Sequence, residues 1–249
     1  MNFNPDDLNK FYNSELGKKC IRIIQHKLEL FLNKANVSSS LGFGYIHPYL
    51  KNKNYETKIS ILSVPSANSE IKFLKKGYNS SIETDEKAFP FNDLQFDTVV
   101  LSHWLEFSDR LDLVISEIWR VLKGQGKFFL IIPNSFSFWG IQEITPFGKC
   151  RPFSKNQINE LLLSNGFDEI KINFCIYFPP SNNKLILNNY KFIEYFGKKI
   201  FKNFGGVMLV EATKFNYAIP KNKLNAYKYK LPKISIQQQC LQNILIVST

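Results

Sequence analysis

The pattern that most constrains this fold is a strand, a helix and a second strand between residues 96 and 133. The runs FDTVVLSHW at 96–104 and KFFLIIP at 127–133 are rich in β-branched and aromatic residues. Between them, residues 111–122 place their apolar side chains at helical spacing. Strands that are apolar throughout, joined through a helix, are typical of a parallel sheet covered on both sides. We therefore predict an α/β fold with a doubly wound, mainly parallel, Rossmann-like sheet and helices on both faces.

Residues with known end preferences flank the helix at 111–122. Ser108 or Asp109 is expected to cap its beginning, where a side-chain oxygen can accept a hydrogen bond from the first turn. Arg120 suits its negative end. Gly124 is expected to end the helix in the left-handed conformation, which glycine adopts freely.

Further elements are predicted on either side. Residues 6–33 have the spacing of one or two helices, and TKISILSV at 57–64 is typical of a buried strand. Ser154 opens the Ser-x-x-Gln spacing of a capping box, and the helix that follows is expected to end at Asn165-Gly166. Two later runs, EIKINFCIYF and GGVMLVEATK, predict antiparallel strands.

Charge is distributed unevenly along the chain. The net charge is +11, yet no acidic residue follows Glu211, whereas six lysines do; without those six, 26 basic residues stand against 21 acidic ones. We predict one domain at 1–217 and a basic, loosely attached tail at 218–249. The tail is either simply solvated or a contact surface for RNA or another polyanion.

Several classes of protein are not expected from this sequence. The first ten residues, MNFNPDDLNK, contain acids and no apolar run, unlike a signal peptide. The longest strongly apolar run, FFLII at 128–132, is too short to span a bilayer. The four cysteines lie far apart without a C-x-x-C pair, and the chain has three histidines. We therefore expect no metal site, and reduced thiols in a cytoplasm.

A glycine-containing turn, SSSLGFGYIHPYL at 38–50, precedes these elements. In a doubly wound sheet the ligand lies beyond the carboxyl ends of the strands. Gly42, at the expected end of the first strand, and Gly44 can let a ligand approach the backbone and its N–H donors. The loops around Asp85 and after Leu101 have the same position in the predicted sheet. Two glycines two residues apart are equally common in ordinary tight turns, so the turn alone identifies no ligand.

The order of three signals is similar to that of a known family. Asp85 is followed by the turn AFPF, the next strand begins with Phe96-Asp97 and leads to a histidine, and a helix ends in RVLKGQG at 120–126. In this combination residues 38–134 resemble the class I S-adenosylmethionine-dependent methyltransferases, in particular the type 11 methyltransferase domain. Only the proline and one glycine of that family's motif RVLKPGG are absent. TPFGKCRPFSKNQINELLLSNGF at 145–167 and the run GGVMLVEATK extend the resemblance to residue 217, toward a poorly characterised bacterial subgroup.

The resemblance implies S-adenosylmethionine as the cofactor and assigns residues to it. Gly42 and Gly44 match the turn glycines that lie under the methionine and ribose parts of the cofactor, and Tyr45 follows them. Asp85 matches the acid that accepts a hydrogen bond from the adenine amino group, with Glu86 beside it.

The resemblance also implies residues for the reaction itself. Ser102 and His103 match the loop beside the sulfonium and the methyl acceptor. His103 is a general base only if the acceptor must lose a proton; otherwise it packs beside Trp104. Arg151 can hold an anionic acceptor or merely pair with a carboxylate, and its segment TPFGKCRPFS is expected to lie across the mouth of the cleft.

Three aromatic residues near the predicted site have two interpretations. Phe43, Tyr45 and Trp139 can stack on adenine or fill the core. Packing in the core is the favoured interpretation.

The chain departs from the family's pattern at the turn itself. Ser40 replaces the acid expected before the turn, and Ile46 replaces the third glycine. The run ILSVP at 61–65 ends the second strand without the acid that binds the ribose hydroxyls in the family. Charge-assisted hydrogen bonds contribute about 1.5–3 kcal/mol each. We therefore expect weaker cofactor binding than in relatives that retain both acids.

These observations predict methyl transfer from S-adenosylmethionine to an unidentified acceptor. Two other functions stay open. One is a methyltransferase-fold protein without turnover that binds a partner or a different ligand, and the other is an RNA-binding methyltransferase that uses the basic tail. The fold cannot choose among them, because function resides in the site.

Overall fold

The structure is a computed structural model, in which the described residues all belong to the first of the chain's two units, Met1–Asn216. They are residues 5–35, 38–50, 61–65, 81–84, 88–142 and 145–215. The predicted tail at 218–249 lies outside them, as do Asp85 and Glu86. None of the helices in the described ranges is long and apolar enough to cross a membrane.

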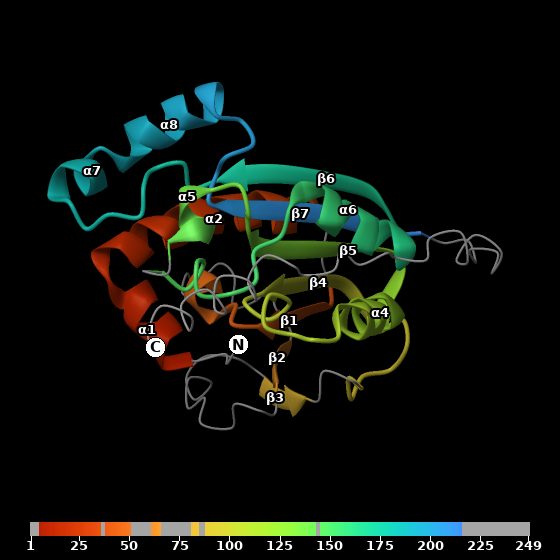
Figure 1. Ribbon diagram of the computed structural model, residues 1–249. Helices are drawn as coiled ribbons and strands as arrows, with labels where there is room; N and C mark the ends of the chain where they lie inside the picture. Colours follow the sequence, from red (N-terminus) through yellow and green to blue (C-terminus); the bar gives the residue numbers. More distant parts are fainter. Residues whose placement is uncertain are drawn as a thin grey trace, which may run out of the picture. The chain divides into compact units, whose positions relative to one another are not determined.

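A seven-stranded sheet runs through the described fold in the order β3-β2-β1-β4-β5-β7-β6 (Figure 1). The strands are β1 (Ser40–Gly44), β2 (Ile61–Pro65), β3 (Ser81–Thr84), β4 (Phe96–Ser102), β5 (Leu122–Pro133), β6 (Phe167–Cys175) and β7 (Val207–Lys214). Neighbours among β1 to β5 pair in parallel, whereas β7 pairs antiparallel with both β5 and β6. The predicted parallel sheet with late antiparallel strands is therefore confirmed.

Helices cover both faces of this sheet. They are α1 (Pro5–Asn13), α2 (Glu15–Lys34), the 3-10 helix η1 (His47–Leu50), α4 (Leu111–Val121), α5 (Phe138–Ile141), α6 (Lys155–Ser164), α7 (Lys184–Asn188) and α8 (Tyr190–Ile200). On one face, α1 and α2 share a core with Phe129 and Ile131 of β5. On the other, α4 and α6 share a core with Phe128, Leu130 and Ile132. Alternate side chains of a strand point to opposite faces, so β5 is buried on both sides, which explains its continuous apolar run.

The beginning of α4 differs from the prediction. Its N-cap residue is Arg110, and none of the described side chains caps it. Ser108 does not cap the helix; its hydroxyl accepts a hydrogen bond from the N–H of Arg110 (3.1 Å), before the first turn. Asp109 is exposed. The cap prediction is therefore wrong, because the helix begins one residue later than a cap at Asp109 requires and two residues later than a cap at Ser108 requires.

The end of α4 also differs from the prediction. The chain passes directly from the helix into β5 at Leu122. The residue in the left-handed region is Gln125 (φ 62°), not Gly124. The pairing of β4 with β5 changes register here, because Phe96 pairs with Leu122 and Thr98 with Lys127. The left-handed bend therefore belongs to the irregular start of β5 and not to a helix end.

Helix α6 agrees with the prediction at both ends. The Ser154 hydroxyl accepts from the N–H of Gln157 (3.3 Å), and Oε1 of Gln157 accepts from the N–H of Ser154 (2.9 Å). This is the predicted capping box. At the other end Asn165 is the C-cap, and Gly166 adopts a φ of 83°.

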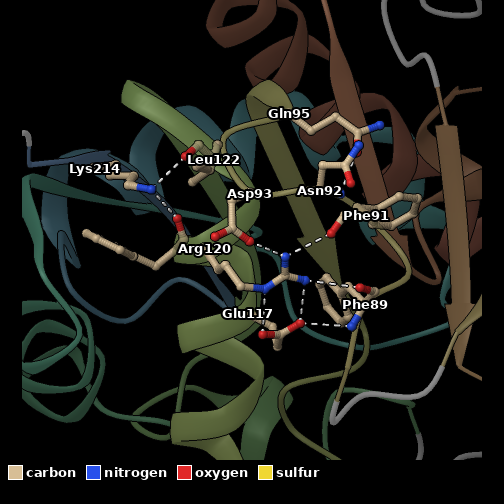
Figure 2. Close-up of polar contacts among 10 residues, drawn as sticks. Phe89, Phe91, Asn92, Asp93, Gln95, Glu117, Arg120, Leu122 and Lys214 are labelled. Carbon is tan, nitrogen blue, oxygen red and sulfur yellow. Dashed lines mark hydrogen bonds and ion pairs between the residues drawn. The ribbon is translucent and has the colours of Figure 1, made fainter.

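Arg120 holds the turn that precedes β4 (Figure 2). Its guanidinium donates to the carbonyl oxygens of Phe89 (3.0 Å) and Phe91 (2.8 Å) and to the carboxylates of Asp93 (2.6 Å) and Glu117 (2.8 and 2.9 Å). Glu117 in turn accepts from the N–H of Phe89 (2.8 Å). The first residue of the RVLKGQG motif therefore fastens the AFPF turn to α4.

Asp97 ties the start of β4 to the residues before β1. Its carboxylate accepts hydrogen bonds from the hydroxyls of Ser38 (2.6 Å) and Ser39 (2.8 Å), from the N–H of Ser39 (2.9 Å) and from Lys123 Nζ (2.8 Å). Partial burial alone would raise the pKa of Asp97, but these hydrogen bonds hold that pKa well below its usual range. One aspartate thus joins β4, Lys123 and the residues before β1 at this corner of the sheet.

Asp97 gives the fold a predictable dependence on pH. A carboxyl with a depressed folded-state pKa stabilises the fold fully above its unfolded pKa, and this stabilisation is lost as pH falls through the folded value. We expect the free energy of unfolding to fall by about 1–2 kcal/mol more in the wild type than in Asp97→Asn between about pH 5 and pH 3. Urea unfolding at several pH values measures this, with the exposed Asp109→Asn as the matched control. Parallel profiles for wild type and Asp97→Asn would contradict it.

Candidate active site

The glycine turn packs against the carboxyl end of β4. Gly44 is the last residue of β1 and has a φ of 77°. A Cβ atom on it would lie 2.3 Å from the carbonyl oxygen of Ser102. The N–H of Tyr45 donates to that same oxygen (2.8 Å), and the N–H of Ile46 donates to the carbonyl of Gly44 (3.1 Å). The turn therefore needs glycine for its own packing, and two of its N–H donors are bonded within the chain.

Gly42 does not lie at the end of the first strand. It is the third residue of β1, where it pairs with Leu62 on one side and Val100 on the other. The prediction is wrong because β1 continues as far as Gly44, which makes the turn. β3 ends at Thr84, one residue before Asp85.

A buried histidine–glutamate pair lies just beyond β4. His103 follows the strand directly, with a φ of 52°. Its Nδ1 lies 3.1 Å from Oε1 of Glu106, and the two side chains are 1% and 0% exposed. A left-handed backbone is uncommon for a residue other than glycine and is retained where the surrounding structure fixes it, often at functional sites. The surrounding structure therefore holds His103 and Glu106 in a fixed arrangement.

Tyr12 of α1 contacts the ring nitrogen of His103 that does not face Glu106. Its hydroxyl lies 2.5 Å from Nε2 of His103 and 2.5 Å from the hydroxyl of Tyr49. Burial raises the pKa of Tyr12 and of Tyr49 well above the usual range, and it raises the pKa of Tyr45 to about 12. These hydroxyls stay protonated at neutral pH. With the His103 proton on Nδ1, facing Glu106, the Tyr12 hydroxyl donates to Nε2.

Three buried oxygen atoms in this region have no full hydrogen bond within the described part of the chain: Oε2 of Glu106, Oγ of Ser102 and Oγ1 of Thr145. Ser102 Oγ approaches the Tyr49 hydroxyl without the geometry of a full hydrogen bond. A buried polar atom without a partner costs about 1–3 kcal/mol, and more when it is charged. The site therefore favours a ligand group that donates hydrogen bonds or carries positive charge.

The segment after α5 lies against the pair. The ring centroid of Phe147 is 5.3 Å from that of His103, and the N–H of Arg151 donates to the carbonyl of Glu106 (3.3 Å). Burial and the Glu106 charge raise the pKa of the Cys150 thiol, so this cysteine is no nucleophile. The side chain of Arg151 is exposed and forms no hydrogen bond or ion pair with residues of the described ranges. Its role toward an acceptor stays a prediction.

The structure brings together some of the predicted residues and adds others. Ser102 and His103 lie beside the glycine turn, as predicted, whereas Tyr12 and Glu106 were missed. Glu106 stands three residues after His103, a separation that a tight turn brings together, so the local sequence HWLEF held a signal. Tyr12 is 91 residues from His103, and no local pattern could have paired them.

The aromatic residues near the turn belong to the core. Phe43 is fully buried, and Tyr45 and Trp139 are buried in the cluster on the opposite face of the sheet. The indole N–H of Trp139 donates to the carbonyl of Phe178 (2.7 Å). The favoured interpretation of these residues is confirmed.

Known proteins share a domain and a fold with this chain. Residues 38–130 match the family model of the methyltransferase domain. No curated protein sequence matches the chain. A S-adenosylmethionine-dependent methyltransferase from Archaeoglobus fulgidus is 19% identical with a TM-score of 0.59, over 82% of this chain and 96% of that chain. One from Thermotoga maritima is 19% identical with a TM-score of 0.54, over 79% of this chain and 94% of that chain.

A third similar structure is a methyltransferase from Haloferax volcanii, solved in complex with the methyltransferase activator Trm112. It is 15% identical with a TM-score of 0.56, over 86% of this chain and 99% of that chain. Likeness at these identities shows a shared fold. The domain and the fold imply S-adenosylmethionine as the cofactor. Residues 38–130 thus match a methyltransferase domain, and the chain shares the fold of solved S-adenosylmethionine-dependent methyltransferases.

Proposed function

We propose that this protein transfers a methyl group from S-adenosylmethionine to an acceptor that gives up a proton to His103. The observation that supports this best is the buried His103–Glu106 pair beyond β4. A base whose second ring nitrogen is held by a carboxylate is the usual arrangement for proton transfer. An acceptor with an ionisable O–H or N–H group suits such a base.

The residues beyond β4 fit the chemistry of this cofactor. S-adenosylmethionine carries an ammonium and a sulfonium group, and Oε2 of Glu106 is a buried carboxylate oxygen without a partner among the described residues. Ser102, the last residue of β4, adds a buried hydroxyl. The glycine turn has fewer N–H donors for the cofactor, because those of Tyr45 and Ile46 are already hydrogen-bonded within the chain. We therefore assign the polar end of the cofactor to Glu106 and Ser102.

The cofactor, when bound, supplies an electrophilic methyl group. Glu106 orients His103 through the 3.1 Å contact at Nδ1, which directs Nε2 toward the Tyr12 hydroxyl. An acceptor reaches Nε2 by displacing that hydroxyl. A base positioned in this way contributes about 10²–10⁴-fold to a rate. Asp85 and Glu86, outside the described residues, keep their proposed place at the adenine, and Arg151 keeps its proposed place at the acceptor.

Cofactor binding is the first test of this proposal. We expect a dissociation constant of about tens to hundreds of micromolar, because Ser40 and the run ILSVP stand where relatives have acids. Glu106→Gln keeps the size of the side chain but removes its charge, and should weaken binding at least about tenfold. Titration calorimetry measures both, with Glu194→Gln, a partly buried carboxylate of α8, as the matched control.

A second variant separates binding from turnover. His103→Asn should bind the cofactor about as well as the wild type but lose methyl transfer about 100-fold. The readout is transfer of labelled methyl from the cofactor to fractionated cell extract, and the exposed His26→Asn is the control. Absence of binding heat at millimolar cofactor would refute the proposal and favour the function without turnover.

A further inference from the structure

Helices α7 and α8 join the two antiparallel strands β6 and β7, and Figure 1 shows them at the margin of the described fold. Helix α8 turns one stripe inward. Tyr190 and Gly197 are buried, and Ile193 and Glu194 lie partly buried between them. A Cβ atom on Gly197 would lie 2.4 Å from Cβ of Tyr177, so the helix packs closely on the chain after β6. This spacing of three and four residues accounts for one face of α8.

The exposed surface of α8 also carries large apolar side chains. The large apolar side chains that are at least 41% exposed on α8 and the loop after it form what we call the aromatic surface: Phe192, Tyr195, Phe196, Ile200, Phe201 and Phe204. The rings of Phe192 and Phe196 lie against each other, with centroids 4.4 Å apart. A helix that is apolar on both sides has a second face to bury.

The charges around the aromatic surface have one sign. The exposed lysines between residues 184 and 204 are Lys184, Lys191, Lys198, Lys199 and Lys202. The one acidic residue of that range, Glu194, is directed inward, where its carboxylate accepts from the N–H groups of Ile176 (2.9 Å) and Tyr177 (2.6 Å). Nζ of Lys199 lies 4.5 Å from the ring centroid of Tyr195. Aromatic side chains and lysines thus share one exposed surface.

We propose that the aromatic surface binds to the surface of a membrane that contains anionic lipids. Aromatic and aliphatic side chains beside lysines are the composition of helices that lie in the interface of a bilayer. The rings and Ile200 would enter the boundary between headgroups and acyl chains, and the lysines would contact anionic headgroups. Charge complementarity selects this occupant. A second copy of this chain would bring lysines against lysines. RNA would offer no apolar partner to Ile200.

The first experiment is sedimentation of the full-length protein with vesicles of phosphatidylcholine, alone or mixed with phosphatidylglycerol. We expect binding to the anionic vesicles, and at least about tenfold weaker partitioning for Phe192→Ser/Phe196→Ser/Ile200→Ser. The matched control is Leu94→Ser/Leu113→Ser/Leu163→Ser, whose side chains are 55%, 39% and 49% exposed elsewhere on the chain. The basic residues after 217 are present in every protein compared, so they cannot produce the difference.

Two further variants test the mode of binding. Lys191→Glu/Lys198→Glu/Lys202→Glu should abolish the preference for anionic vesicles, whereas Lys10→Glu/Lys155→Glu/Lys171→Glu, also exposed, should keep it. Phe196→Trp should gain fluorescence that brominated acyl chains quench, and Leu163→Trp should not. Far-ultraviolet circular dichroism verifies that each variant is folded.

Three results would overturn the proposal. One is equal vesicle binding by the two serine triple variants, and another is the absence of quenching in Phe196→Trp. The third is a change of molar mass, measured by light scattering, on mutation of the aromatic surface without any change in vesicle binding. That result would make the surface an interface between copies of the chain.

Discussion

Gly44→Ala is expected to lower the free energy of unfolding by about 3–5 kcal/mol. Gly44 has a φ of 77°, where a residue with a Cβ atom is strained by about 1–2 kcal/mol. The new Cβ would also lie 2.3 Å from the carbonyl oxygen of Ser102 and 3.1 Å from Cβ of Trp104. The first of these atoms is backbone in the middle of a paired sheet, so it cannot move aside without disturbing β4.

The measurement is urea unfolding of wild type and Gly44→Ala without cofactor. Gly124→Ala is the matched control, because Gly124 is exposed and lies outside the left-handed region. Its stability should change by no more than about 0.5 kcal/mol. If Gly44→Ala kept wild-type stability and lost only cofactor binding, the glycine would serve the ligand and not the packing against β4.

Gly44 also shows what the sequence could predict at the site. The pattern around Gly42 and Gly44 correctly placed a turn at the end of β1. It could not tell which glycine makes the turn, because that depends on how far β1 stays paired with β4. Nor could the sequence tell whether Gly44 makes room for a ligand or for the backbone of Ser102, because either one requires a residue without a side chain.

Elements with local signals were predicted well, and those set by distant contacts were not. The capping box of Ser154 and the left-handed Gly166 flank one helix, and both are present. The end of α4 is instead set by the pairing of β5 with β4, which moved the left-handed residue to Gln125. Helix α8 was missed because its aromatic and β-branched residues have weak helix propensity. Its position depends on packing against Tyr177.

The same distinction holds for the polar residues of the site. His103 was found through the family resemblance of the segment around it, whereas Tyr12 comes from a helix near the N-terminus, 91 residues earlier. For the RVLKGQG motif, the sequence predicted the position of Arg120 but not most of its contacts. The sequence placed Arg120 at a helix end, where a positive charge is favourable. In the structure Arg120 also donates three hydrogen bonds to the turn before β4 and two to Glu117 of α4.

Replacement of Arg120 by alanine is therefore expected to lower the free energy of unfolding by about 3 kcal/mol. Two carbonyl oxygens, those of Phe89 and Phe91, would lose their donor, and Glu117 would lose its bidentate partner. The Glu117 side chain is 17% exposed, so water solvates its carboxylate poorly. Asp93 contributes little, because its side chain is 72% exposed.

Arg120→Lys distinguishes charge from geometry. A lysine keeps the positive charge but cannot reproduce the planar fork that reaches Glu117 and two carbonyl oxygens together. We expect it to recover less than half of the loss in urea unfolding, while Arg110→Ala, at the exposed N-cap arginine of α4, changes stability by about 0.5 kcal/mol or less. The turn that Arg120 holds begins two residues after Glu86, so Arg120→Lys should also weaken cofactor binding more than Arg110→Ala does. Full stability of Arg120→Lys would show that charge alone fastens this turn.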